Sequence, residues 1–178
     1  MGYITTYTGK HFDPMKPDEA ALDIRDIAHA LSLTCRGNGH VKNFFSVGQH
    51  CISCAKEAAA RGYSNRVVLG CLLHDASEAY MSDVPRPFKA VLKEYVEAED
   101  KLIDLIYFHF MGKTLNEEEK ELVREVDDDL LYYDMIELLG VPQEGPAPAI
   151  HIELDYGTCS FGNVENEYID LFEAWKLK

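Results

Sequence analysis

The sequence has little positive charge and no apolar run long enough to cross a membrane. Its 178 residues include 31 Asp and Glu against 17 Lys and Arg, which gives a formal net charge of −14. Such a surface repels the phosphates of a nucleic-acid polymer, so we expect neither a nucleic acid nor a membrane as partner. The first residues also lack the basic and then apolar pattern of a signal peptide, and we therefore expect a cytoplasmic protein.

Cysteine is scarce and odd in number, which argues against a disulfide-stapled secreted fold. The five cysteines include one short spacing, Cys51-x-x-Cys54, that could belong to a redox or zinc motif. No second pair with this spacing accompanies it, and both residues fall in an Ala-rich helical stretch. We therefore interpret them as small packing residues.

Helical spacing of apolar residues runs through most of the chain. The sequence predicts one all-α domain over 1–178, a helical bundle whose core spans about 24–139. A short extended N-terminal segment precedes this core, and a C-terminal loop and helix at 141–178 follow it. The predicted helices lie at about 23–33, 46–61, 88–111, 114–139 and 163–176, with a further core helix inside 67–87. The helix at 114–139 is expected to begin at a capping box of Thr114 and Glu117.

The stretch from Val67 to Pro87 carries ionisable groups at its centre. If its first half is a helix, apolar residues cover every face of that helix. A helix that is apolar all round belongs in a core. Burying His74 and Asp75 there requires a partner for the carboxylate, and a metal ion is the strongest one available. Glu78 follows His74 at i+4 on the same face, and Asp83 precedes the Pro-x-Pro turn expected to end the helix. This pattern is typical of an active site.

Two residues from other helices can complete a metal site. His50 lies one turn inside its helix, among small and apolar residues. Asp127 shares an apolar helical stripe and should face inward, whereas Asp128 and Asp129 are rotated away from it by about 100° and 200°. Four protein groups are enough to hold one divalent ion with positions left open. The predicted ligands are His50, His74, Asp75 and Asp127.

The order of these residues, His50 … His74-Asp75 … Asp127, resembles the H…HD…D signature of the HD-domain metal-dependent phosphohydrolases. Within that superfamily, the stretch HDASEAYMSDVPRPFK is similar to the bacterial 5′-deoxynucleotidases. The resemblance covers about 24–139 and implies an HD-domain helical bundle. It also implies the same four metal ligands.

The resemblance assigns roles to residues around the metal. Glu78 would orient or deprotonate the attacking water, or protonate the leaving oxygen. Asp83 would lie at the pocket mouth and assist catalysis or contact the sugar. Arg36, in a loop before the first histidine, would clamp phosphate with its planar fork of donors, and Lys89 would add positive charge.

The loop at 35–45 departs from that family. Gly37 follows Arg36 where the deoxynucleotidases carry a tryptophan that helps to reject a 2′-hydroxyl. The choice between deoxyribose and ribose therefore stays open. His40 and Lys42 share the loop with Arg36 and are candidates for further substrate contacts.

The resemblance implies an enzyme of nucleotide metabolism, a hydrolase that removes the 5′-phosphate of a (deoxy)nucleoside monophosphate. A triphosphohydrolase that releases tripolyphosphate from a dNTP is an alternative. An inactive, nucleotide-sensing HD protein is an alternative of another class. Two His and two Asp suit Co, Mn, Zn, Fe, Ni or Mg, so the native metal and the base preference stay open. We expect a small-molecule nucleotide as partner and a homo-oligomer.

Overall fold

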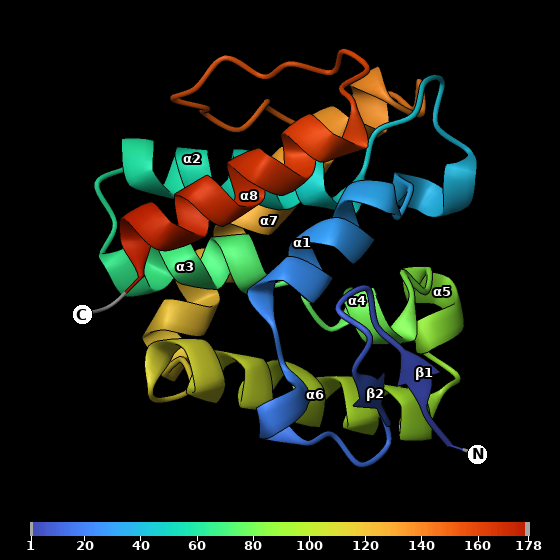
Figure 1. Ribbon diagram of the computed structural model, residues 1–178. Coiled ribbons are helices and arrows are strands. Elements are labelled where there is room, and N and C mark those ends of the chain that lie inside the picture. The colour runs from blue at the N-terminus through green and yellow to red at the C-terminus, as the bar shows by residue number, and fades with distance from the viewer. Residues whose placement is uncertain (1, 177–178) are drawn as a thin grey trace.

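The computed structural model describes residues 2–176, which form α-helices and a small two-stranded sheet near the N-terminus (Figure 1). The prediction of an all-α fold is confirmed. Within the described residues, no helix combines the length and apolarity needed to cross a bilayer.

Strand β1 (Ile4–Thr5) pairs antiparallel with β2 (His11–Phe12). The helices are α1 (Ile24–Leu33), α2 (Val47–Ala60), α3 (Asn65–Leu73), α4 (Glu78–Met81), α5 (Arg86–Lys89), α6 (Lys93–Met111), α7 (Glu117–Glu137) and α8 (Phe161–Trp175), with short 3-10 helices η1 (Glu19–Ala21) and η2 (Arg36–Gly39).

One hydrophobic core holds these helices together. Helices α2 and α3 pack against each other, α7 contacts both, and α8 crosses α1, α2 and α3 (Figure 1). The residues of α3 from Val67 to Leu73 are all buried, as an all-round apolar helix requires. Tyr168 of α8 lies in the same core, and its hydroxyl donates a hydrogen bond of 2.5 Å to the carbonyl of Leu72.

The predicted core helix inside 67–87 is wrong as one continuous element. Helix α3 ends at Leu73, and the next residues turn through hydrogen bonds from Ala76 N to Leu73 O and from Glu78 N to Asp75 O. The ring of His74 hydrogen-bonds the Cys71 carbonyl at 2.7 Å, which is the carbonyl that a continued helix would offer to residue 75. Glu78 therefore begins a separate helix, α4.

Three other predicted helix starts were wrong. Helix α7 begins after Asn116, which forms the capping box with Glu119, because Leu115 enters the core instead of a first helical turn. Helix α6 begins at Lys93, and Phe88 lies 57% exposed in the separate turn α5. Helix α8 begins at Phe161 because Ser160, rather than a later residue, caps it.

The segment between α7 and α8 is a long loop, as predicted, and contains no strand between residues 141 and 160. Glu57 of α2 fixes it in place. This carboxylate is fully buried, and it accepts hydrogen bonds from the backbone N–H and the ring of His151 at 2.9 and 2.8 Å. Arg61 donates a further bond to it at 2.8 Å.

A close approach between α1 and α2 makes Gly48 sensitive to substitution. A Cβ there would lie 3.0 Å from a methyl group of Val164 and 3.2 Å from the backbone of Leu31 and Ser32. Gly48→Ala should lower the free energy of unfolding by about 1–3 kcal/mol, since backbone atoms cannot move aside cheaply. The control is Gly162→Ala, where a Cβ meets nothing within 4 Å. Urea titration should show the control unchanged or slightly stabilised, and equal losses in both variants would contradict the prediction.

Candidate metal centre

Two histidines from neighbouring helices face each other in the interior. His50 lies in the second turn of α2, whose start is fixed by a capping box between Ser46 and Gln49. His74 follows the last residue of α3. Because α2 and α3 pack together, their rings lie with centroids 5.3 Å apart, and the His50 side chain is only 1% exposed.

In both rings, Nδ1 already has an oxygen acceptor. His74 Nδ1 lies 2.7 Å from the Cys71 carbonyl, and His50 Nδ1 lies 3.0 Å from Asp134 Oδ2. A carbonyl can only accept, so Nδ1 of His74 carries a hydrogen; the same holds for His50 opposite a carboxylate. This arrangement orients both imidazoles with Nε2 pointing into the centre, as in metal-bound histidines.

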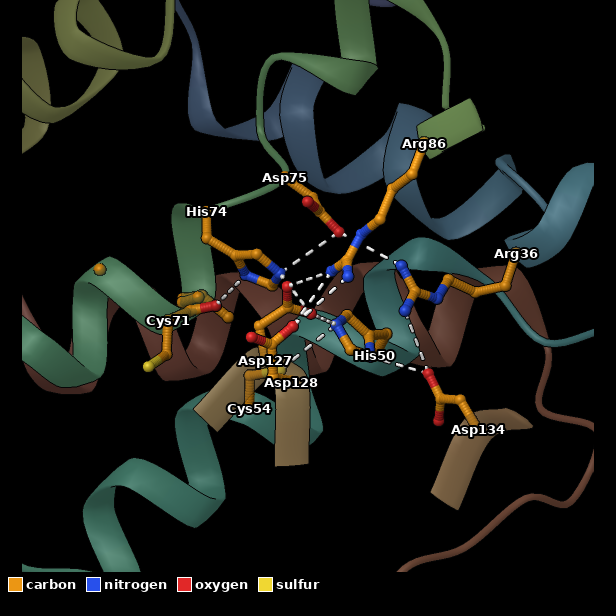
Figure 2. A network of polar contacts seen from close by, with 12 residues as sticks. Arg36, His50, Cys54, Cys71, His74, Asp75, Arg86, Asp127, Asp128 and Asp134 are labelled. Atoms are coloured by element: carbon orange, nitrogen blue, oxygen red, sulfur yellow. Dashed lines mark hydrogen bonds and ion pairs between the residues drawn. The ribbon is translucent and has the colours of Figure 1, made fainter. Parts of the chain in front are cut away.

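Both Nε2 atoms face the same oxygen of Asp127 (Figure 2). Asp127 Oδ1 lies 3.0 Å from Nε2 of His50 and 3.6 Å from Nε2 of His74. Asp75 Oδ2 approaches Nε2 of His74 at 3.3 Å. Bonds of about 2.0–2.3 Å to one ion would place neighbouring ligand atoms about 2.9–3.6 Å apart, so the separations between Asp127 and the two histidines fit a shared cation. The predicted ligand Asp75 reaches His74 but does not fall in the group that holds His50, His74 and Asp127 within 4.8 Å of one another.

The Nε2 atom of His74 is buried and has no hydrogen-bond partner among the described residues. A lone pair that faces two carboxylate oxygens is repelled by them unless a cation lies between. The atoms of His50, Cys54, His74 and Asp127 lie within 4.8 Å of one another, and an overlapping group joins His74 to Asp75 and Cys51. This buried group could therefore bind a metal ion.

Without a metal, protons take the place of the cation. Burial disfavours the charged form of His74, but Asp75 and Asp127 outweigh burial and raise the pKa of His74 well above its usual value. For His50, burial and Arg36 lower the pKa, and the bonds to Asp127 and Asp134 reverse this to a net rise. The same histidines hold the pKa of Asp127 far below its usual range, although burial alone would raise it.

Arg36 lies beside this centre at the start of η2. Its guanidinium donates to Asp134 at 3.1 Å and lies 3.5 Å from Asp75, and the side chain is 14% exposed. Gly37, Asn38 and Gly39 follow in left-handed backbone conformations, which turn the loop sharply away. The arginine is thereby held at the wall of the site.

A cavity of about 580 Å³ opens onto the centre. Its charged end is lined by predicted residues, namely Arg36, Asp75, Glu78, Asp83, Lys89 and Asp127. Its other wall is largely apolar and comes from α7 and the residues around it, including Leu131, Tyr132, Met135, Leu138 and Leu139. Such a volume and lining are typical of a small-molecule site.

The two predicted catalytic carboxyls differ from ordinary surface acids. Burial, followed by the charges of Asp75 and Asp83, raises the pKa of Glu78 to about 9. Its Oε2 atom is buried without a hydrogen-bond partner within residues 2–176. Burial also raises the pKa of Asp83. In the metal-free protein, Glu78 therefore favours the neutral carboxyl at pH 7, which can donate a proton.

The predicted substrate contacts are only partly brought together. Lys89 lines the cavity, where its ammonium group lies 2.8 Å from Glu99. Lys42 and His40 are exposed and do not line it, and Lys42 instead reaches the carbonyl of Ile136 at 3.4 Å.

Three residues of the centre were missed in the sequence. Asp134 lies two turns after Asp127 on the same face of α7, an i+7 spacing that could have indicated it. Cys54 lies one turn after His50 and was interpreted as a packing residue. Arg86 of α5 reaches Asp127 Oδ2 and Asp128 Oδ1, both at 3.3 Å, and no sequence pattern indicated this contact.

No protein-family model matches the chain. Two curated proteins are similar to part of it. The uncharacterized protein YfdR of Escherichia coli is 38% identical over 102 residues, which cover 57% of this chain and 54% of YfdR. An uncharacterized protein of Rhodobacter capsulatus is 35% identical over 109 residues, covering 58% and 55%. The chain thus spans about half the length of the curated relatives it matches.

Removing the carboxylate that orients His50 should weaken metal binding without removing a ligand. Asp134→Asn should lower the affinity for Zn²⁺ or Co²⁺ about 10- to 100-fold, measured by isothermal titration calorimetry. Asp129→Asn is the control, because Asp129 lies on the same helix but pairs with Arg61 at 2.8 Å. Equal affinities of the two variants would contradict this role of Asp134.

The raised histidine pKa values predict how stability depends on pH. A group whose pKa rises on folding stabilises fully below its unfolded pKa, about 6.5 for histidine, and this stability is lost as the pH rises through the folded pKa. In a chelator, the free energy of unfolding should therefore fall above about pH 6.5, and Glu78 acts with the same sign. Urea titrations from pH 6 to 9 measure this, and His74→Gln should flatten the decline. A stability that rises over this range would contradict the prediction.

Proposed function

We propose that this chain is a divalent-metal-dependent phosphohydrolase that removes the 5′-phosphate of a (deoxy)nucleoside monophosphate. One observation carries the proposal: the two Nε2 atoms converge on Asp127 at the charged end of a cavity that Arg36 and Glu78 also line. The HDASE stretch and its resemblance to 5′-deoxynucleotidases supply the reaction class.

His50, His74, Asp75 and Asp127 would hold the ion. When bound, the ion lowers the pKa of a water molecule and offsets charge on the phosphoryl group. The protein's own part begins with the orientation of these ligands, because Asp134 and the Cys71 carbonyl fix the two rings.

Arg36 would bind the phosphate group of the substrate. Its guanidinium is held between Asp75 and Asp134, so little side-chain freedom is lost when phosphate binds. Lys89 adds a second positive charge at the same end of the cavity. The apolar wall around Leu131 and Tyr132 gives the nucleoside a surface to pack against.

Glu78 supplies the proton for the leaving group. In the metal-free protein its pKa of about 9 favours the protonated carboxyl at neutral pH, which is the state required of a general acid. As the P–O bond breaks, the leaving 5′-oxygen takes this proton, and the proton released by the attacking water restores the carboxyl. Asp83, also at the cavity wall, assists this transfer or contacts the sugar.

Glu78→Gln should reduce kcat about 10²- to 10⁴-fold while the bound metal stays unchanged, because the amide cannot supply a proton. Activity is measured as phosphate release, and the metal content by elemental analysis. Glu97→Gln, at an exposed position on α6, is the matched control. Full activity of Glu78→Gln would exclude Glu78 as the acid.

The reaction itself is tested by following products from dAMP, AMP and dATP in the presence of Mn²⁺, Co²⁺ or Mg²⁺. Release of orthophosphate from dAMP is the expected result. Tripolyphosphate from dATP, with dAMP untouched, would replace the proposal with a triphosphohydrolase. Nucleotide binding without any hydrolysis would leave a nucleotide-sensing protein instead.

A further inference from the structure

The buried pair Cys51 and Cys54 lies directly under the metal centre. All five cysteines of the chain are free, and these two are 0% and 1% exposed. Cys54 lies one turn after His50 on α2, so both side chains lie on the same helix face. The Cys54 Sγ lies 3.4 Å from Nε2 of His50, close to that centre in Figure 2.

This separation fits two ligands of one ion. Metal bonds of about 2.3 Å to sulfur and 2.0–2.1 Å to nitrogen, at a tetrahedral angle, place the two atoms about 3.5 Å apart. The Sγ atom also lies within 4.8 Å of the ligand atoms of His74 and Asp127. The buried and unpartnered Nε2 of His74 belongs to the same group, which independently indicates a ligand there.

A hydrogen bond from the thiol does not account for the whole group. The Nε2 of His50 has one lone pair, and it faces both the thiol and the Asp127 carboxylate, which has no hydrogen to offer. A thiol that satisfies His50 would still leave the lone pair of His74 facing carboxylate oxygens. Protons on the two rings resolve both conflicts in the metal-free protein, and one metal ion in contact with all four groups would resolve them together.

We propose that Cys54 is a further metal ligand, and that its thiolate makes the centre prefer thiophilic ions such as Zn²⁺ and Co²⁺ over Mg²⁺. On binding, the S–H bond breaks, a metal–sulfur bond forms, and the proton leaves to solvent. Soft thiolate ligands favour such ions over the hard, oxygen-seeking Mg²⁺. The inference rests on the metal centre of the proposed function.

We assign Cys54, rather than Cys51, as the ligand because the two sulfur atoms lie close to different residues. Cys54 belongs to the group that contains both histidines and Asp127. Cys51 belongs to the smaller group with His74 and Asp75, which lacks His50. Cys51 therefore provides a matched control with the same burial and on the same helix.

The experiment is Co²⁺ titration of the metal-free, full-length chain with absorption spectroscopy. The wild type should develop the visible d–d bands of bound Co²⁺ and a near-ultraviolet thiolate charge-transfer band. Cys54→Ser should lose the charge-transfer band, whereas Cys51→Ser and Cys159→Ser should keep it. Calorimetry should show Zn²⁺ affinity falling at least about tenfold in Cys54→Ser, and Mg²⁺ affinity falling less.

X-ray absorption of the Zn²⁺-loaded Cys51→Ser variant, which keeps Cys54 but lacks the neighbouring sulfur, decides the question if Cys54→Ser fails to fold. One sulfur neighbour at about 2.3 Å is expected. Bound metal with only nitrogen and oxygen neighbours, or d–d bands without the charge-transfer band, would overturn the role of Cys54 and leave the proposed function standing. A wild type that binds neither Co²⁺ nor Zn²⁺ would overturn the role of Cys54, and one that also binds neither Mn²⁺ nor Mg²⁺ would overturn the proposed function as well.

Discussion

The convergence of two imidazole nitrogens on one oxygen of Asp127 is the constraint on which the rest of the site depends. In a buried setting, these lone pairs and carboxylates create a strongly negative potential that only a cation can offset. Protons satisfy it in the free protein, which is why both histidines are more basic than usual. A divalent ion would satisfy the same need with one charge centre.

The groups around the two histidines either orient the rings or offset the negative charge of the carboxylates. Asp134 and the Cys71 carbonyl hold the ring hydrogens away from the centre, so both reactive nitrogens point inward. Arg36 balances Asp75 and Asp134 on one side, and Arg86 balances Asp127 and Asp128 on another. The candidate ligands lie on α2 and α7 and at the end of α3, which pack directly together, so a rigid scaffold sets their positions.

Much of this arrangement could be predicted from residue patterns, because the periodicity of apolar residues indicates which side of a helix is buried. This periodicity predicted α1 and α2, and it predicted that Asp127 faces inward whereas Asp128 does not. It failed at 74–77, where a side-chain bond from His74 ends α3, since helical periodicity carries no information about such a bond. It also missed Asp134 and Cys54, because spacing shows which residues share a face but not what lies opposite. The contact of Arg86 depends on how α5 folds back and has no local signature.

The buried carboxylate of Glu57 has a mechanical consequence. It joins α2 to His151, 94 positions later, and so acts like a tether across a wide span of sequence. If the loop beyond α7 peels away, Glu57 loses both hydrogen bonds to His151 and keeps only its ion pair with Arg61. A stretch without regular structure is thus held at one point, and the amide of His151 should exchange hydrogen more slowly than its unbonded neighbours in the loop.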